Sequence, residues 1–411
     1  MSIVFLSPTG QSGGAEAALI ELLAGLRESH PSWSLDVIVA SDGPLVGGVR
    51  ALGVPVQVLP FPPSVARLGD WSVGTGLLAR AKFLVRCAGI AWPAARYLRR
   101  LRSLLRDRGP VVIHTNGFKM HVLGAWAKPR DSKVLWHLHD YIARRALTAT
   151  LLRYSAHRCA AAIANSRSVA DDMRTVCGSA LPVHPVWNAV DLNRFSPRGP
   201  QLDLDAMSGL PSATDVIRVG LIATFARWKG HPTFLRALAM LPPSLRVRGY
   251  VIGGPVYETA GSQVTLEELR QEAISLGLAN RVGFTGMVPD SSAAMRALDV
   301  VVHASTDPEP FGLVIAEAMA CGKPVITSGA GGARELAEPD VNALVHTPGD
   351  AADLARAIDA LASNAKLRAR IGAAGRATAE RSFTRRRLAS ELTPIYEGLA
   401  GPPRGGPSVR H

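Results

Sequence analysis

The sequence predicts an α/β protein with two domains, each built on a doubly wound parallel sheet. The chain has 411 residues, which is long for one compact core and favours two domains. Short runs rich in β-branched residues alternate with helical stretches along the chain, a pattern typical of parallel strands joined by crossover helices. Glycine-rich or polar loops follow several of these runs, where open parallel sheets bind their ligands.

The predicted strands fall into two groups, one in each half of the chain. The first group covers residues 3–7, 35–40, 54–59, 111–115, 134–138 and 161–164. The second group covers residues 216–223, 248–253, 282–284, 300–303, 324–327 and 343–346. Because helical stretches separate the strands in both groups, each half is expected to form its own sheet.

The composition indicates a globular chain with excess positive charge. Apolar residues make up 47% of the sequence and charged residues 19%, as in folded proteins. The sequence has no uninterrupted apolar run of about eighteen residues and no secretion-signal layout at its start. Its cysteines include no C-x-x-C pair. We therefore expect a cytoplasmic location. The net charge of +13 favours an anionic partner such as a nucleotide, a nucleic acid or a lipid surface.

Residues 77–106 concentrate this charge in a segment with helical periodicity that we expect to be interrupted near Pro93. One interpretation is an interfacial helix that touches anionic headgroups on the inner face of the membrane. The other is an ordinary amphipathic helix on the sheet with an arginine-rich solvent face. Nucleic acid is not expected as a partner, because no basic motif interleaved with aromatic residues is present.

Two carboxylates, Glu309 and Glu317, mark the strongest candidate site. A predicted strand runs into the proline-flanked loop of Glu309, and Glu317 follows inside a predicted helix. Glu309 is therefore placed to accept hydrogen bonds from ligand hydroxyls, and the first-turn N–H groups around Phe311 and Leu313 face any phosphate beside it. This combination suits a nucleotide sugar. The alternative is a loop carboxylate and a solvated helix carboxylate without a ligand.

Two further loops follow predicted strands in the first half. Gly10, Gly13 and Gly14 let the backbone approach a ligand at a helix start, although a tight packing turn explains them equally well. Their spacing is not that of a nicotinamide site. His137 and His139 share one face of a strand, but a third ligand at useful spacing is missing, so no metal is expected.

The stretch from Glu309 through Pro310-Phe311-Gly312 to Glu317, continued by Ala318-Met-Ala-Cys-Gly-Lys-Pro-Val325, resembles the E-x7-E motif of retaining glycosyltransferases of family 4. The resemblance reaches to about residue 400 and is weakest between residues 60 and 110. It implies the GT-B fold, two Rossmann-like domains that face a cleft. It also implies metal-independent transfer from a UDP- or GDP-sugar to a saccharide or lipid-linked acceptor, in cell-envelope polysaccharide or glycolipid biosynthesis.

The resemblance assigns roles to individual residues. Glu309 holds the sugar hydroxyls and Glu317 the ribose, Lys229 binds the diphosphate, and His139 stabilises the developing positive charge. For His139 the alternative is a structural histidine that is hydrogen-bonded at a strand end. For Lys229 the alternative is a solvated lysine at a helix start. The remaining donor-side residues are Gly13, Gly14, Arg227, Gly253, Thr285, Pro310, Phe311, Gly312 and Leu313, and the acceptor-side candidates are Asn116, Lys119 and Asp140.

One position departs from the family pattern. Thr224 stands where the family usually has an arginine after the strand, and Arg227 is the candidate substitute although its position differs. The resemblance also divides the chain into an acceptor-binding domain (1–195) and a donor-binding domain (196–381). A closing helix (382–400) returns to the first domain, and residues 401–411 are expected to form a disordered tail.

Two other functions remain open at this point. A nucleotide-sugar 2-epimerase also uses two such domains, but the E-x7-E setting of Glu309 favours transfer. A non-catalytic sugar-binding or nucleic-acid-binding protein would explain the charge, but it would not need a phosphate clamp opposite a glycine loop.

Overall fold

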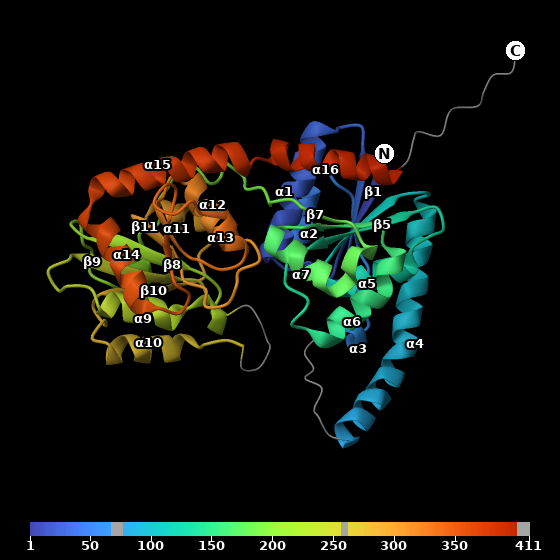
Figure 1. Cartoon of the computed structure of the whole chain (residues 1–411), viewed down its shortest axis with the longest axis horizontal. Coiled ribbons are helices and arrows are strands. Elements are labelled where there is room, and N and C mark those ends of the chain that lie inside the picture. Colours follow the sequence, from blue (N-terminus) through green and yellow to red (C-terminus); the bar gives the residue numbers. More distant parts are fainter. Residues whose placement is uncertain (67–76, 256–261, 401–411) are drawn as a thin grey trace, which may run out of the picture. The chain divides into compact units, whose positions relative to one another are not determined.

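The computed structural model describes residues 1–66, 77–255 and 262–400, without the side chains of residues 77–88. The predicted tail 401–411 lies outside the described residues. The chain divides into two compact units (Figure 1). Unit 1 comprises Met1–Trp187 and Arg385–His411, and unit 2 comprises Asn188–Thr384.

Unit 1 contains a seven-stranded sheet in the order β3-β2-β1-β4-β5-β6-β7, and every recorded pairing is parallel. The strands are β1 (Ser2–Ser7), β2 (Ser34–Val39), β3 (Val56–Val58), β4 (Val112–Asn116), β5 (Lys133–Leu138), β6 (Ala161–Ala164) and β7 (Val183–Pro185). The order reverses direction between β1 and β4. Because parallel crossovers are right-handed, this reversal places the connecting helices on both faces of the sheet.

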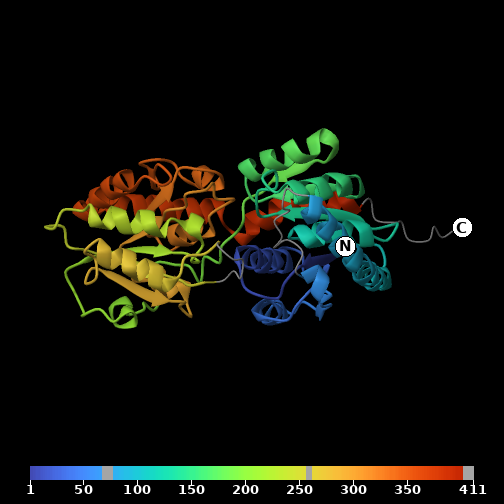
Figure 2. The same ribbon diagram turned by 90° about the horizontal axis from the view of Figure 1, so that it is seen from below.

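The helices of unit 1 form two layers (Figures 1 and 2). One layer joins α1 with α2 and α16, and in the other each of α4, α5, α6 and α7 contacts the next. The helices are α1 (Gly14–Ser29), α2 (Pro44–Ala51), α3 (Pro63–Ala66), α4 (Leu77–Asp107), α5 (Phe118–Ala127), α6 (Ala146–Ser155), α7 (Arg167–Cys177) and α16 (Arg385–Ala400).

Unit 2 contains a six-stranded parallel sheet in the order β10-β9-β8-β11-β12-β13. The strands are β8 (Ile217–Ile222), β9 (Val247–Ile252), β10 (Val282–Gly286), β11 (Val300–His303), β12 (Val325–Ser328) and β13 (Leu344–His346). The helices are α8 (Leu204–Ser208), α9 (His231–Ala239), α10 (Leu266–Ser275), α11 (Ser291–Arg296), α12 (Leu313–Ala320), α13 (Gly332–Leu336), α14 (Ala351–Ser363) and α15 (Ala365–Ser382).

The two doubly wound parallel sheets confirm the predicted fold class, and every predicted strand is present within a few residues of its expected bounds. Central strands such as β1 and β11 are apolar and buried, because helices cover both faces of a parallel sheet. Sequence analysis missed β7. This strand has three residues, ends in Pro185 and lies at the sheet edge, so it carries too short a pattern to recognise.

The expected interruption near Pro93 was wrong, because α4 continues through this proline. Tyr97, Leu101 and Leu105 of α4 are buried at helical spacing in the core of unit 1. Arg96 and Arg99 are exposed. Packing of one apolar face therefore holds the helix together where Pro93 removes a backbone N–H.

The last helix, α16, belongs to unit 1. The Arg385 guanidinium donates to the Glu21 carboxylate of α1 at 2.7 Å. Further along α16, the buried Tyr396 hydroxyl lies 2.8 Å from Nδ1 of His114 in β4. A side chain on Gly25 would clash with the backbone of Arg385, which explains how closely α1 and α16 pack.

The segment after Trp187 packs with unit 2. The Val190 N–H donates to the Phe383 carbonyl at 2.9 Å, and the Arg376 side chain donates to the Phe195 carbonyl at 3.2 Å. The structural units therefore change after Trp187 and after Thr384, eight and three residues from the expected bounds at 195 and 381. In the part of the chain that the structure describes, no helix is both long and apolar enough to cross a membrane.

Candidate functional site

Each sheet has a point at which its strand order reverses. In unit 2 the reversal lies between β8 and β11, and in unit 1 it lies between β1 and β4. Ligands of open α/β sheets bind in the crevice outside the carboxyl ends of the strands at such a switch point.

Lys229 and Glu309 meet at the switch point of unit 2. Lys229 follows β8, and Glu309 follows the neighbouring strand β11. Nζ of Lys229 lies 2.7 Å from Oε2 of Glu309, and the exposed fractions of the two side chains are 22% and 14%. The two residues are 80 positions apart in the chain, so the sheet topology and not chain proximity brings them together.

Two more donors surround the Glu309 carboxylate. Oγ of Ser305 lies 2.9 Å and Nε2 of His303 lies 3.2 Å from Oε2 of Glu309. Because an ionised carboxylate only accepts, Nε2 of His303 is the donor to Glu309, and hydroxyls of β12 lie near the other ring nitrogen. Burial alone would raise the pKa of Glu309, but the Lys229 ammonium and the His303 bond lower this pKa well below its usual range. Glu309 is therefore ionised at neutral pH.

Gly230 brings the lysine to this carboxylate. Its φ of +73° lies in the left-handed region, and a Cβ atom here would lie 1.9 Å from the carbonyl oxygen of Ala304. Only glycine permits this close approach between the β8 loop and the end of β11. The Thr306 N–H also donates to the Trp228 carbonyl at 2.8 Å, which ties the two loops together.

The first turn of α12 adjoins Glu309. Gly312 precedes the helix with a φ of +93°, and α12 has no side-chain cap on its first N–H groups. Phe311 is 2% exposed and packs edge-on against Phe383, so its side chain serves the core and only its backbone can face a ligand. Pro310 and Leu313 are partly buried beside it. This helix start favours a negative group.

Glu317 lies in the middle of α12 and is partly buried. The E-x7-E spacing therefore places one carboxylate in the loop and the other about one turn into the helix, as the sequence indicated. Glu309 precedes α12, so only Glu317 is part of the helix itself.

The strands β9 and β10 are neighbours in the sheet of unit 2, and their carboxyl ends lie side by side. Gly253 donates its N–H to the Gly286 carbonyl at 3.0 Å, and the Thr285 hydroxyl also donates to Gly286 at 3.0 Å. The Arg227 guanidinium lies 3.5 Å from the exposed carboxylate of Glu268 in α10. Thr224, which replaces the family arginine, is partly buried and its hydroxyl has no hydrogen-bond partner.

The crevice of unit 1 begins with the glycine loop after β1. Gly13 precedes α1, which lacks a side-chain cap, and both Gly13 and Gly14 are exposed. Burial raises the pKa of Glu16 in the first turn. Gly10 has a packing role, because a Cβ atom there would lie 2.2 Å from the carbonyl oxygen of Ser41.

Asn116 and His139 meet in this crevice. Asn116 ends β4 and His139 follows the adjacent strand β5, and Oδ1 of Asn116 lies 3.0 Å from Nε2 of His139. The amide nitrogen of Asn116 and Nδ1 of His139 are buried without hydrogen-bond partners. Burial lowers the pKa of His139 to about 4, and the ring is neutral at pH 7.

A buried chain of neutral side chains continues below this pair. Nε2 of His114 lies 3.1 Å from Nδ1 of His137, and Nδ1 of His114 lies 2.8 Å from the Tyr396 hydroxyl. If the Tyr396 hydroxyl donates, the proton of His114 lies on Nε2 and points to His137. Burial, and then the proximity of His139, lower the pKa of His114 to about 3.

Two family models match successive parts of the chain. Residues 12–194 match the model "Glycosyltransferase Family 4", and residues 207–378 match the model "Glycosyl transferases group 1". The chain belongs to glycosyltransferase family 4. This family and its GT-B fold were predicted from the E-x7-E segment, and both are confirmed.

Solved structures and curated relatives agree with this family. The chain is similar to HepE from Anabaena, solved in complex with UDP and with UDP-glucose, at 28% identity and a TM-score of 0.77 over 97% of this chain and 100% of that one. It is 33% identical over 57% of its length to a D-inositol 3-phosphate glycosyltransferase from Xylanimonas cellulosilytica, of which the match covers 56%. It is 30% identical over 54% of its length to the lipopolysaccharide core biosynthesis mannosyltransferase LpcC from Rhizobium leguminosarum bv. viciae, of which the match covers 61%. The chain thus spans a little more than half the length of these two curated relatives.

Two acceptor-side candidates of this family-4 chain have local partners. Nζ of Lys119 donates to the carbonyl of Ala66 in α3 and lies 5.9 Å from the ring centre of Phe61. Asp140 forms an ion pair with Arg145 and accepts from the Tyr141 N–H at 2.8 Å. These contacts give both side chains a structural role in unit 1.

The sequence Asp203-Leu204-Asp205, which spells a metal-binding motif, has another role. Asp203 caps α8 by accepting from the Ala206 N–H at 3.0 Å. Asp205 is 3% exposed and accepts from Arg218 at 3.0 Å, from Arg248 at 2.5 Å and from the Tyr250 hydroxyl. Burial alone would raise the pKa of Asp205, but these hydrogen bonds lower it well below its usual range. Within the described residues, no three His, Cys, Asp or Glu side chains are grouped to hold a metal ion.

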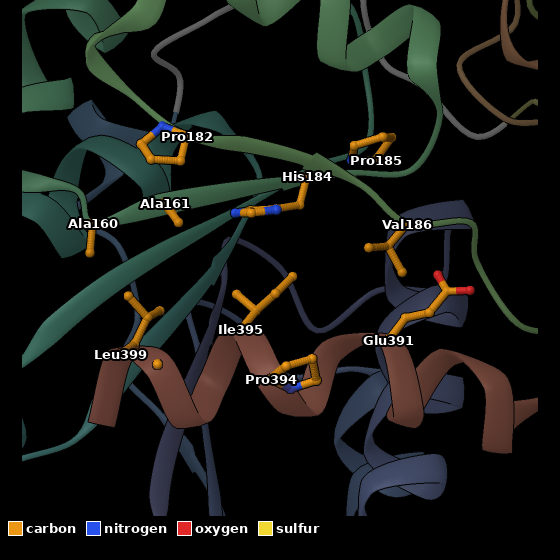
Figure 3. Close-up of a pocket in the computed structure, with 11 residues that line it drawn as sticks. Ala160, Ala161, Pro182, His184, Pro185, Val186, Glu391, Pro394, Ile395 and Leu399 are labelled. Carbon is orange, nitrogen blue, oxygen red and sulfur yellow. The ribbon is translucent and has the colours of Figure 1, made fainter. Parts of the chain in front are cut away.

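A hollow of about 640 Å³ lies elsewhere in unit 1, between the edge strand β7 and helix α16 (Figure 3). His184 projects from the strand toward Ile395 of the helix, and Leu399 and Pro182 line the same space. None of the predicted site residues lines this hollow. Its lining is mostly apolar, so the polar chemistry of unit 1 lies at the switch point instead.

Sequence analysis missed several polar contacts that the structure forms at the site or elsewhere in the two units. For Ser305 and His303 the only indication in the sequence is their position at the end of a predicted strand, close to Glu309. His114 and His137 were noted on strands, but their link to Tyr396 crosses 282 positions of the chain and has no local signature. The buried Asp205 cluster was likewise hidden, because its arginines lie on two different strands.

Proposed function

We propose that this chain is a retaining glycosyltransferase that moves a hexose from a nucleotide-diphosphate sugar to an acceptor hydroxyl. The Lys229–Glu309 pair at the switch point of unit 2 is the observation that carries the proposal. An ammonium suits the negative charge of a leaving diphosphate, and the adjacent carboxylate suits the hydroxyls of the sugar attached to it.

Unit 2 is the proposed donor-binding domain, with bounds expected near 196 and 381. Lys229 and the first turn of α12, from Pro310 to Leu313, would hold the diphosphate, and Glu317 would hold the ribose. Arg227 adds a cation after the same strand, although it already faces Glu268. Gly253 and Thr285 would line the nucleobase side through backbone groups. A uridine donor is the first to test, because HepE was solved with UDP and UDP-glucose.

Unit 1 is the proposed acceptor-binding domain. The uncapped start of α1 at Gly13 and Gly14 would face the donor's diphosphate. The neutral His139 ring would stabilise developing positive charge at the reacting carbon without charge repulsion. Asn116 holds this ring and would present its amide to the acceptor. Lys119 and Asp140 remain weaker candidates because of their local partners.

The chemistry that these residues support needs an oriented diphosphate. When the bond between sugar and phosphate breaks, negative charge grows on the phosphate oxygens, where Lys229 stabilises it. In the proposed mechanism the acceptor hydroxyl attacks the anomeric carbon from the side that the diphosphate leaves, and a phosphate oxygen takes its proton. That geometry retains the anomeric configuration. The acceptor is proposed to be a saccharide or a lipid-linked saccharide of the cell envelope, reached by peripheral contact with the inner face of the membrane.

A donor screen tests this function directly. We expect UDP and one UDP- or GDP-hexose to raise the melting temperature of the protein, and the hexose to be transferred to a component of a bacterial lipid or saccharide extract. NMR of the product linkage would then give the anomeric configuration. A Glu309→Gln variant should still bind the nucleotide but transfer the sugar far more slowly.

Three outcomes would contradict the proposal. Conversion of the donor to its C2 epimer without an acceptor would identify an epimerase. Stabilisation by sugars or nucleic acids, without any nucleotide effect, would identify a binding protein. An inverted anomeric centre in the product would overturn the retaining mechanism while leaving glycosyl transfer in place.

A further inference from the structure

Helix α6 carries an exposed apolar stripe that the proposed chemistry does not use. Leu147, Leu151 and Tyr154 are 45%, 46% and 65% exposed. Their spacing of four and three residues places them on one face of the helix. On the opposite side, Ala149, Leu152 and Ser155 are buried, as the packing of α6 between α5 and α7 requires. The stripe is thus the outer surface of this helix layer.

An aromatic group extends the stripe onto α5. The Trp126 ring of α5 stacks on Tyr154, with ring centres 5.7 Å apart and an angle of 18° between the planes. The Arg158 guanidinium lies 4.6 Å from the centre of the Trp126 ring. We call Leu147, Leu151, Tyr154 and Trp126 the α6 patch. Rings with an apolar body and a polar tip are enriched where proteins meet the membrane–water interface.

The surroundings of the α6 patch are strongly basic. Asp107 is the only acidic residue in the sequences of α4, α5 and α6. Arg153 is exposed beside the stripe, and the like charges of Lys133 and Arg158 add to burial in lowering the pKa of Lys128. On α4, Trp92 is 68% exposed with the Arg99 guanidinium 5.1 Å from its ring centre.

Three of the nearby acidic side chains are engaged within unit 1. Asp140 pairs with Arg145, and Asp171 pairs with Arg174 at 2.7 Å. The Asp172 carboxylate accepts from the N–H of Ile142 at 2.6 Å, ahead of α6. Asp131, in the loop after α5, is exposed. The layer therefore combines an apolar ridge with an excess of cations.

We infer that the α6 patch docks on an anionic lipid bilayer, with Leu147, Leu151 and Tyr154 entering the headgroup boundary and the surrounding arginines facing lipid phosphates. A narrow apolar ridge flanked by cations is the arrangement of an interfacial helix. Charge complementarity favours a bilayer over a second copy of this chain, because two copies would bring like charges together. The inference names the surface for the membrane contact in the proposed function and rests on that contact, but not on the identity of the donor or acceptor.

Vesicle binding tests this inference with matched variants. Wild-type protein, Leu147→Ser/Leu151→Ser/Tyr154→Ser and a control, Met240→Ser/Ile274→Ser, are mixed with vesicles rich in phosphatidylglycerol or made of phosphatidylcholine alone. Met240 and Ile274 are 57% and 56% exposed on unit 2, and Ile274 lies on the acid-containing helix α10. We expect wild type and control to sediment with the anionic vesicles, less so at high salt, and the triple variant to lose about tenfold or more in affinity.

Folding and nucleotide response are checked in the same samples. All three proteins should keep the same melting temperature and the same stabilisation by UDP, so a failed donor assignment would leave the lipid result interpretable. Equal vesicle binding by the triple variant would overturn the inference, as would absence of binding by the wild type. Equal binding to both vesicle types would exclude the role of anionic lipid. A wild-type dimer in solution that the triple variant abolishes, without any vesicle effect, would assign the patch to self-association.

Discussion

The two units place their candidate residues at equivalent points of the fold, but these residues are charged in unit 2 and neutral in unit 1. Both place their candidate residues where the strand order reverses. In unit 2 the crevice contains an ion pair between Lys229 and Glu309, held 2.7 Å apart. In unit 1 the equivalent crevice contains neutral groups, the glycine loop and the Asn116–His139 pair.

The same contrast is found below the crevices. The buried polar cluster of unit 2 is ionic, with Asp205 between Arg218 and Arg248. The buried polar chain of unit 1 runs through Tyr396, His114 and His137 and is neutral. A doubly wound sheet therefore fixes where a site lies but not its charge, and the charged unit is the better suited to a diphosphate.

Replacing Asp205 should give the largest effect on stability. Asp205→Asn leaves two arginines and a tyrosine with only part of their acceptor, and we expect the free energy of unfolding of unit 2 to fall by about 3–5 kcal/mol. Urea unfolding measures the change. Asp203→Asn is the matched control, because asparagine caps a helix as well as aspartate. Equal losses in both variants would show that the ionic cluster of unit 2 matters no more than an exposed cap.

Replacing Glu309 should give the largest effect on activity. In Glu309→Gln the neutral amide keeps the shape but loses the charge opposite Lys229, and we expect the kcat of transfer to fall by about 10²- to 10³-fold. Initial rates at saturating donor measure this. Asp307→Asn, an exposed change in the same loop, should retain normal rates.

A loop carboxylate that made few contacts could be replaced by alanine without loss of stability. The structure instead gives Glu309 three close donors, Lys229, Ser305 and His303, so the alanine variant should also lower the melting temperature. If Glu309→Gln transferred the sugar at the wild-type rate, Glu309 would not be an active-site residue.

Lys229 should matter for the phosphates and not for the base. We expect Lys229→Met to weaken UDP binding by about 10- to 100-fold, the range for a hydrogen bond to a charged group, and to change uridine binding little. Calorimetric titration with both ligands separates the two effects. Lys366→Met, on the exposed start of α15, serves as the control. A similar loss for UDP and uridine would contradict the clamp.

Acidification should weaken unit 1 before unit 2. Buried histidines with lowered pKa values stay neutral in the folded state and protonate in the unfolded state below its pKa of about 6.5. Their contribution to stability is therefore complete above pH about 6.5 and declines as the pH falls toward 4, by up to about 1.4 kcal/mol per pH unit for each histidine. Such histidines are His114, His121, His137 and His139 in unit 1 and His231 and His346 in unit 2.

The carboxylates of unit 2 affect its stability at a lower pH than the histidines do. Glu309 and Asp205 have lowered pKa values, so the stability they provide is present above their unfolded values near 4 and is lost only as the pH falls further. Hydrogen exchange followed by mass spectrometry can report each unit separately. We expect protection in unit 1 to fall more steeply between about pH 6.5 and 4.5. Equal slopes in both units would contradict the contrast.

The smallest expected effect concerns the hydroxyl of Tyr396. Tyr396→Phe removes the partner of Nδ1 in His114 and should lower the free energy of unfolding of unit 1 by about 1 kcal/mol. Thermal unfolding followed at several protein concentrations measures it. Tyr154→Phe, at an exposed position, should stay within about 0.5 kcal/mol of the wild type. A loss in Tyr396→Phe as large as that of Asp205→Asn would show that neutral and ionic clusters contribute alike.

The sequence by itself determined the secondary structure and the position of the principal motif. Alternation of β-branched runs and helical stretches located the long strands, because local side-chain pattern decides whether a segment can be buried in a sheet. It also placed Glu309 in a loop and Glu317 in a helix. It did not reveal β7, whose pattern is too short, and it broke α4 at Pro93, where tertiary packing outweighs the cost of a missing N–H.

Only the tertiary structure decided which side chains meet. Lys229 reaches Glu309 across 80 positions because β8 and β11 are neighbours in the sheet, and because Gly230 permits the close approach. Tyr396 reaches His114 because α16 returns to unit 1. Local free energies select strands and helices, whereas the contacts of a site depend on strand order and crossover direction, which no single segment encodes.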